Sequence, residues 1–338
     1  MCHIRFAANM TAEPEFTTAV LNYIDANLFD SLKREGALCK PGEYYGFEPD
    51  EETVKLLSEC NGAPAPRKVI IHDARLMNDS EKPLLSTYHF ELIPDRLGEL
   101  ACALHSSPDL SLGNSKRYVD SIEILVKDYV QRRLRVNVRF AAVFDLAKRR
   151  SGSSNQQELP LPFIHSDYTN ESGVTRLQQQ AFSCQDALAP VAFPPLQERF
   201  EDETELKEYI SGKKRFLIIN VWRNADPDRG HIKQDPLAVC DPRTIQKDAW
   251  VTYEIFCSKD LSLFEYHISG GDGDEDCSSH KWYYYSQMSV DECLMWISHD
   301  SGKKLLSVPH TSFKIQESSG QRKSIEARAF VFLDEIND

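Results

Sequence analysis

The sequence lacks any apolar run of the roughly 20 residues that a membrane-spanning helix needs. Its first residues, MCHIRFAANMTAEPEF, also lack the apolar centre of a secretory signal peptide. With 41% hydrophobic and 27% charged residues, the 338-residue chain has the composition of a globular protein with a sizeable core. These features predict a cytoplasmic protein with no membrane partner.

Positive charge is scarce, since 39 lysines and arginines face 52 aspartates and glutamates and leave a net charge of −13. Proteins that bind nucleic acid neutralise its phosphates with clustered lysine and arginine. The deficit therefore predicts no nucleic-acid partner. A neutral or modestly polar small molecule is the substrate that such a chain accommodates most easily.

Paired cysteine motifs are missing as well. The nine cysteines are scattered along the chain and form no C-x-x-C pair. Zinc knuckles and disulfide frameworks need regularly spaced cysteines, so neither is expected. We expect reduced thiols, most of them buried.

The apolar pattern predicts a protein that is mainly β with flanking helices, in the α+β class. From residue 160 onward, short strand-like runs separated by turns predominate, and only residues 203–211 interrupt them as a helix. Many short strands of this kind are typical of a jelly roll. We therefore expect a double-stranded β-helix, that is, a jelly-roll or cupin-like core, over residues 151–338.

The first part of the chain is mixed in pattern. Residues 117–133 carry apolar side chains at helical spacing and predict an amphipathic helix. Residues 66–76, 86–93 and 135–144 contain β-branched or alternating runs and predict strands. Residues 1–150 are therefore expected to form an α/β extension that packs on the core as one compact unit.

Two histidines precede an acid by two places: His165 before Asp167, and His89 before Glu91. Chance alone predicts about 1.5 such pairs (10 × 52/338), so the spacing decides nothing by itself. On a strand, residues two apart point to one face, so His165 and Asp167 could reach one metal ion. His89 and Glu91 have no companion pattern downstream, and we interpret them as a solvated strand face.

A non-haem Fe(II) site with two histidines and one carboxylate leaves one face open for co-substrate and dioxygen. His310 is the best candidate for the second histidine, because an Arg-x-Ser pair, Arg322 and Ser324, begins twelve residues later. The guanidinium can fork onto a carboxylate and the hydroxyl can donate a second bond, which is the anchor expected for 2-oxoglutarate. Arg328 lies on the same face of the last strand and is the alternative anchor.

Five segments together resemble the fungal hydroxylase/desaturase family, which includes aspergillic acid hydroxylase, gibberellin desaturase and the CmcJ-like proteins of cephamycin methoxylation. The family carries N-V-W-R-P, P-L-A-x-C-D, W-Y-Y/F, H-T-x-F and R-E-S-I-E-x-R segments, and the resemblance spans about residues 65–333. The matching residues here are 220–223, 236–241, 282–284, 310–313 and 322–328.

The resemblance implies an Fe(II)- and 2-oxoglutarate-dependent dioxygenase that oxidises a secondary metabolite on a double-stranded β-helix. Two positions depart from the family pattern: Asn224 replaces a proline and Lys323 replaces a glutamate. Neither removes a metal ligand, so they bear on the substrate rather than on the class of reaction. The expected products are succinate, carbon dioxide and a hydroxylated, desaturated or oxidatively cyclised substrate.

Four residues are candidates for contact with the substrate: Tyr168, Trp222, Arg223 and Tyr284. Aromatic residues on strands are more often core than pocket wall, and a structural ion pair is an equal alternative for Arg223. A homodimer, or a heterodimer with a homologue, is compatible with the sequence.

Two other functions stay open at this point. A non-catalytic partner subunit could keep the fold without chemistry, although it would need neither three ligands nor the Arg-x-Ser anchor. A metal-dependent isomerase or cyclase could use the same barrel without consuming 2-oxoglutarate. Only the dioxygenase releases succinate in proportion to product.

Overall fold

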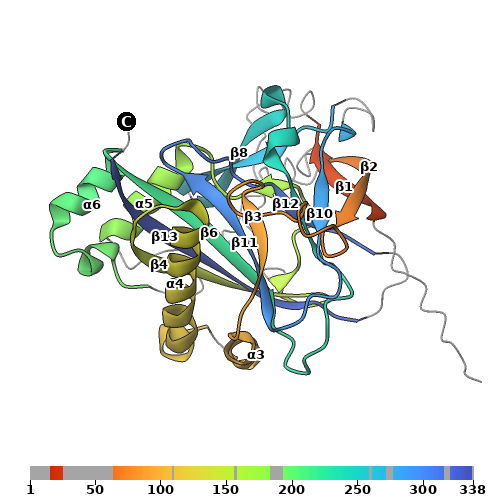
Figure 1. The fold of residues 1–338 in the computed structure, drawn as a ribbon, viewed down its shortest axis with the longest axis horizontal. Helices are drawn as coiled ribbons and strands as arrows, with labels where there is room; N and C mark the ends of the chain where they lie inside the picture. The colour runs from red at the N-terminus through yellow and green to blue at the C-terminus, as the bar shows by residue number, and fades with distance from the viewer. Residues whose placement is uncertain are drawn as a thin grey trace, which may run out of the picture.

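The computed structural model describes residues 16–25, 64–108, 110–155, 158–182, 193–258, 261–271, 277–315 and 320–336. Thirteen strands in these residues form two sheets, one of eight strands and one of five. Two helices, Gly98–Ser106 (α3) and Leu112–Leu134 (α4), cover one face of the smaller sheet, and α4 crosses its strands (Figure 1).

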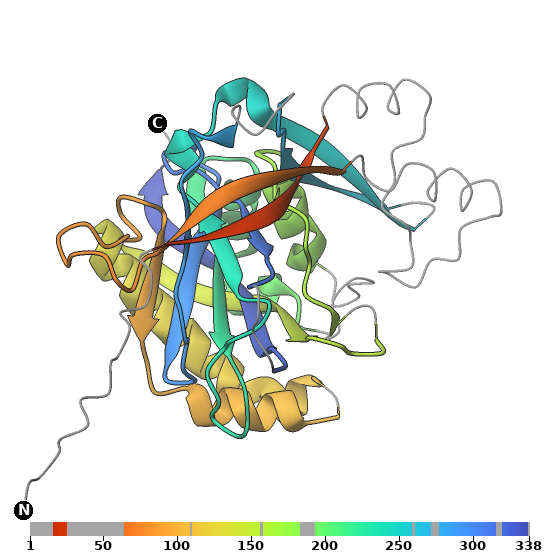
Figure 2. The same cartoon turned by 90° about the vertical axis from the view of Figure 1, so that its right-hand side faces the viewer.

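The larger sheet has the strand order β1-β2-β10-β7-β12-β5-β9-β8. A long β1–β2 ribbon forms one edge of it (Figure 2). In sheet order, its strands are Phe16–Ile24 (β1), Pro64–Asp73 (β2), Trp282–Tyr284 (β10), Leu237–Cys240 (β7), His310–Ser312 (β12), His165–Ser166 (β5), Leu261–Ile268 (β9) and Trp250–Ser258 (β8).

The smaller sheet is antiparallel throughout, with the order β3-β11-β6-β13-β4. Its strands are Phe90–Pro94 (β3), Glu292–Asp300 (β11), Lys214–Asn224 (β6), Lys323–Ile336 (β13) and Val138–Arg150 (β4). The helices are Gly98–Ser106 (α3), Leu112–Leu134 (α4), Ser172–Phe182 (α5) and Glu203–Ile210 (α6), with short 3-10 turns at Leu196–Arg199, Pro242–Thr244 and Lys247–Ala249.

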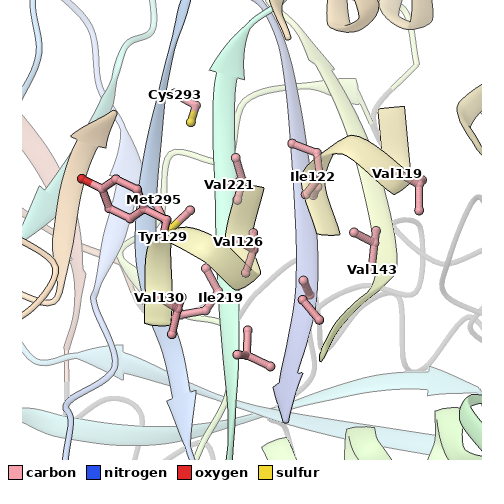
Figure 3. Packing of buried hydrophobic residues seen from close by; sticks show 14 of the residues in the cluster. Val119, Ile122, Val126, Tyr129, Val130, Val143, Ile219, Val221, Cys293 and Met295 are labelled. Atoms are coloured by element: carbon pink, nitrogen blue, oxygen red, sulfur yellow. The ribbon is translucent and has the colours of Figure 1, made fainter. Parts of the chain in front are cut away.

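The outer face of the smaller sheet packs on α4 because both carry apolar side chains at matching periods. Val119, Ile122 and Val126 lie on one side of the helix, where helical spacing brings them together. They pack against alternate residues of the strands, among them Ile219 and Val221 (Figure 3). This burial fixes which face of each strand is left for the interior between the two sheets.

The inner faces of the two sheets meet in a second apolar cluster. Trp222 and Trp296 of the smaller sheet pack there with Val239 and Tyr283 of the larger one. Side chains alternate along each strand, so Ile325, Ala327, Ala329 and Val331 of β13 face α3 and α4. Ser324, Glu326 and Arg328 therefore face the interior.

The expected elements are largely present. The predicted helices at residues 117–133 and 203–211 are α4 and α6, and the strands after residue 160 form where expected, although β5 and β12 are very short. The prediction of a single helix after residue 160 was wrong, because α5 follows the turn after Asp167. Strands of the first 150 residues belong to both sheets.

The interpretation of His89 and Glu91 as a solvated face was also wrong. Both side chains are buried. Glu91 accepts a 2.9 Å hydrogen bond from the backbone N–H of Leu85 and forms an ion pair with Arg133, while His89 Nδ1 lies 3.1 Å from the carbonyl of Leu306. Their partners are structural, and the pair is tied into the fold rather than exposed to water.

Candidate metal centre

His165, Asp167 and His310 come together between the two sheets. One ligand atom of each residue lies within 4.8 Å of the others, and within the described residues this is the one such group of three histidine, cysteine or acidic side chains. His165 of β5 lies directly opposite His310 of β12, so strand pairing places both imidazoles on one face. Asp167 follows β5 at once.

Backbone contacts orient both imidazoles. Nδ1 of His165 lies 2.9 Å from the carbonyl of Phe163, and Nδ1 of His310 lies 3.1 Å from the carbonyl of Val308. A carbonyl only accepts, so each Nδ1 carries the proton and donates it. Each Nε2 then faces the carboxylate of Asp167, and these atoms lie 4.0 and 3.8 Å from its oxygens.

The Asp167 carboxylate is held by three donors from the smaller sheet. Asn220 Nδ2 and Ser298 Oγ donate to Oδ2 at 2.9 and 3.2 Å, and Arg328 Nη2 donates to Oδ1 at 2.9 Å. Burial alone would raise the pKa of Asp167, but the charges of Arg328, His310 and His165 lower it to about 2. The carboxylate is therefore ionised at neutral pH.

These donors fit a divalent iron. Two imidazole nitrogens and one carboxylate are the ligand types of a non-haem Fe(II) site, and both imidazoles already have the tautomer that presents a lone pair. Arg328 also contacts Asp145 and Glu326, so this group holds one positive and three negative formal charges. A dication at the triad would neutralise the net charge of minus two.

A second polar site lies at the start of β13. Arg322 is 3% exposed, and its Nε donates to Ser324 Oγ at 2.9 Å while Nη1 donates to the carbonyl of Asp235 at 2.9 Å. Its guanidinium carbon lies 5.0 Å from the ring of Trp222, which faces Glu326 across the strand pair. The side chain thus leans along the sheet in the direction of the triad.

Arg322 has the electrostatics of an anion site. No carboxylate of the described residues forms an ion pair with it, and the contacts above are to a hydroxyl and a carbonyl. Burial and the nearby charge of Arg149 lower the pKa of Arg322 to about 9. A buried guanidinium in this state gains most from a carboxylate ligand.

Two buried indole groups also point to a ligand in the interior. Among the described residues, Nε1 of Trp222 and Nε1 of Trp296 have no hydrogen-bond partner. Trp222 contacts Arg322, and the ring of Trp296 lies 4.8 Å from that of His310. An indole N–H only donates, so an oxygen-rich ligand between the triad and Arg322 would satisfy both.

One row of side chains crosses the inner face of the larger sheet through the histidines. Residues that lie directly opposite one another on neighbouring strands form this row, which runs in the order Tyr283, Val239, His310, His165 and His267. The His267 imidazole lies 2.7 Å from a carboxylate oxygen of Glu265, and both are buried. No sequence motif pointed to this pair, which borders the triad because β9 pairs with β5.

Two of the proposed substrate contacts lie on the wrong faces. Arg223 is wholly buried on the helix side of the smaller sheet, where it forms a bidentate ion pair with Asp95, its Nη1 2.7 Å from a carboxylate oxygen. Tyr284 packs on Phe313 in the outer cluster of the larger sheet, whereas Tyr283 faces inward. Strand alternation turns both away from the triad.

The other two proposed contacts remain on the interior side. Trp222 lies between the sheets beside Arg322. Tyr168, next to Asp167, packs with α5 and inner residues of β4 and β13, among them Phe144 and Phe330. Sequence reasoning gave no role to Asn220 and Ser298, although Asn220 lies in the N-V-W-R segment.

Comparison with known proteins places the chain in a family. A family model described as an oxidoreductase/YMDC permease-like domain matches residues 33–332. The chain belongs to that family. Within the described parts of the chain, no helix is both long and apolar enough to cross a membrane.

Relatives confirm the expected resemblance to fungal hydroxylase/desaturases. The hydroxylase/desaturase CTB9 of Cercospora beticola is 34% identical over 134 residues, 36% of this chain and 39% of that protein. The Fe(II)/2-oxoglutarate-dependent dioxygenase nvfI of Aspergillus novofumigatus is 28% identical over 291 residues, 81% of this chain and 86% of that one. The match to CTB9 thus spans about two fifths of that protein's length.

A solved structure confirms the double-stranded β-helix. A variant of the iron and alpha-ketoglutarate-dependent endoperoxidase NvfI superposes with a TM-score of 0.68, covering 96% of this chain and 99% of that one at 21% identity. At this identity the likeness establishes the fold, and the chemistry has to be argued from the side chains.

Proposed function

We propose that the protein is an Fe(II)- and 2-oxoglutarate-dependent dioxygenase that oxidises a small-molecule secondary metabolite. The outcome is hydroxylation, desaturation or oxidative ring formation, with release of succinate and carbon dioxide. One observation carries the proposal: a triad of two histidines and one carboxylate shares an interior with a buried arginine that has no carboxylate partner among the described residues.

His165, Asp167 and His310 would hold Fe(II), which with 2-oxoglutarate and dioxygen supplies the oxidising chemistry. The protein's part is to position the reactants and to exclude water. Arg322 would bind the distal carboxylate of 2-oxoglutarate through a charge-assisted bond, and Ser324 would donate a second one. The two indole N–H groups are further donors for oxygen atoms of ligands between these sites.

The protein also fixes the orientation of the three side chains that would hold the metal. The Nδ1–H bonds to Phe163 and Val308 keep both imidazoles in one orientation, and the three donors on Asp167 keep its carboxylate in place. The apolar cluster around Trp222, Trp296 and Tyr283 borders this site and limits access of water. Such preorganisation gives the substrate one position relative to the metal.

The relatives support the reaction class. Their names describe hydroxylase/desaturases, an Fe(II)/2-oxoglutarate-dependent dioxygenase and an iron and alpha-ketoglutarate-dependent endoperoxidase. A small-molecule substrate is consistent with these relatives. A cytoplasmic location, and a homodimer or a heterodimer with a homologue, stay predictions.

The test is succinate release by the protein reconstituted with Fe(II) and 2-oxoglutarate under air and screened against secondary metabolites of the source organism. The dioxygenase should release one succinate per oxidised substrate. Product without succinate would identify an isomerase or cyclase instead. A protein that binds neither Fe(II) nor 2-oxoglutarate would be the non-catalytic subunit.

A further inference from the structure

Arg328 contacts three carboxylates of this chain, those of Asp145, Asp167 and Glu326. Its Nη1 donates to Asp145 Oδ2 at 2.7 Å, and its Nη2 donates to Asp167 Oδ1 at 2.9 Å and lies 2.8 Å from Glu326 Oε1. The side chain is 17% exposed. Both terminal nitrogens are therefore committed to carboxylates of this chain.

Asp167 depends on such contacts because no strand fixes it. The β5 strand ends at Ser166, so the residue that provides the carboxylate lies just beyond the ladder that positions His165. Its three donors come from β6, β11 and β13 of the opposite sheet. Arg328 is the charged one, and it in turn is held by Asp145 of the neighbouring strand β4, directly opposite in register.

We propose that Arg328 is a positioning residue for the metal-binding carboxylate and not the anchor of 2-oxoglutarate. Its planar fork links Asp145 to Asp167 and so ties the metal ligand of one sheet to the frame of the other. The inference rests on the proposed function, because it gives Arg328 a role at the same triad.

The contrast with Arg322 supports this division of labour. Arg322 lies directly before β13 and Arg328 lies within it, six residues further or about 20 Å along an extended chain, so they serve different ends of the site. Arg322 donates to neutral oxygens and pairs with no carboxylate of the described residues, whereas both terminal nitrogens of Arg328 bind carboxylates of this chain and, among the described residues, only its buried Nε lacks a hydrogen-bond partner.

Replacing Arg328 with lysine separates position from charge. Lysine keeps the positive charge but loses the fork that spans two carboxylates. Mn(II) serves as the probe, because it replaces Fe(II) without reacting with air and its binding is followed by electron paramagnetic resonance. Loss of outer contacts to metal ligands typically weakens metal binding about 10- to 100-fold. We expect Arg328→Lys to weaken Mn(II) binding within this range and to alter the spectrum of bound Mn(II).

The matched control is Arg215→Lys. Arg215 forms a bidentate pair with Asp300, both bonds 2.8 Å, in the same sheet, and this pair is more deeply buried than the contacts of Arg328. It should lose stability without a change in Mn(II) affinity. If Arg215→Lys lowers Mn(II) affinity as much as Arg328→Lys does, then loss of any buried ion pair weakens metal binding, and the inference is overturned.

Asp145→Asn provides a second variant that is gentler on the fold. Among the described residues, Asp145 forms its ion pair with Arg328 and none with the triad, so we expect its effect to pass through Arg328. We expect a smaller loss of Mn(II) affinity, and the double variant should lose less than the sum of the two. Strict additivity would contradict the link.

Three further outcomes are decisive. If Arg328→Lys binds Mn(II) as tightly as the wild-type protein, the inference is overturned and the proposed function still stands. Intact Mn(II) binding with a large loss of 2-oxoglutarate affinity would make Arg328 the anchor and overturn it too. Failure of the wild-type protein to bind Mn(II) would overturn the proposed function and the inference together.

Discussion

His310 lies directly opposite His165 in the antiparallel pairing of β12 with β5, and their ring centroids are 4.4 Å apart. Both strands are very short, so their register is fixed mainly by the flanking strands β7 and β9. The larger sheet thus sets the spacing of the two imidazoles, and the smaller sheet sets the position of the carboxylate between them.

Removal of a ligand should abolish metal binding without unfolding the protein. His165→Ala, Asp167→Ala and His310→Ala each remove a polar group that faces the interior and leave the apolar clusters intact. We expect each to lose Fe(II) binding and turnover while circular dichroism stays native. His72→Ala is the control, since His72 is exposed in the same sheet; normal Fe(II) binding by His310→Ala would place the third ligand elsewhere.

Arg322→Leu should raise the 2-oxoglutarate requirement strongly. A charge-assisted bond to a carboxylate contributes on the order of 1.5–3 kcal/mol, or about ten- to a hundredfold in affinity. Lys323→Leu is the control, because it removes the same charge from the next residue, whose partner is Asp226. Isothermal titration with 2-oxoglutarate compares the two under anaerobic conditions, and equal affinities would refute the assignment of Arg322.

Arg223→Met should damage stability and leave ligand binding unchanged. The variant leaves the buried Asp95 carboxylate without its ion-pair partner, and breaking a buried pair in this way lowers the free energy of unfolding by about 3–5 kcal/mol. Denaturant unfolding measures the loss, and 2-oxoglutarate titration at low temperature measures binding. A folded variant with weakened binding would restore the substrate role that its position contradicts.

The same pair predicts a pH dependence. Burial would raise the pKa of Asp95, but the bonds from Arg223 outweigh it and lower the pKa below 3.8. Because the folded pKa is depressed, the pair stabilises the protein above the ordinary aspartate pKa, and this contribution is lost as the pH falls through the folded one. Wild-type stability should therefore fall more steeply below pH 4 than that of Arg223→Met, and parallel curves would contradict the linkage.

Gly173→Ala should destabilise the start of α5. An added Cβ would lie 2.4 Å from the ring of His299, and both His299 and Gly173 are buried. Overpacking of this kind costs typically 1–3 kcal/mol. Thermal unfolding should show a lower midpoint, whereas Gly113→Ala, where nothing lies within 4 Å, should not.

The sequence predicted the structure well where apolar residues recur at the spacing of a helix or a strand. Helical spacing located α4, and alternation along β13 separated Ile325 and Ala327 from Ser324 and Arg328. His310 could be chosen among ten histidines because the Arg-x-Ser pair follows it. Local patterns of this kind survive folding because burial of one face enforces them.

Other features depend on packing that no local pattern encodes. Arg223 and Trp222 are neighbours on one strand, so one faces the helices and the other the interior, and the sequence does not say which. The donors on Asp167 come from three strands that are far from it in sequence. The Glu265–His267 pair borders the triad only because β9 lies next to β5.

The most direct test of the account is an anaerobic titration of the wild-type protein and of His310→Ala with Fe(II) and then 2-oxoglutarate, followed by visible absorption. The account predicts that a metal-to-ligand charge-transfer band appears in the wild-type protein and saturates at one 2-oxoglutarate per chain, and that it is absent from His310→Ala. A wild-type protein without this band, or a His310→Ala variant with an unchanged one, would contradict it.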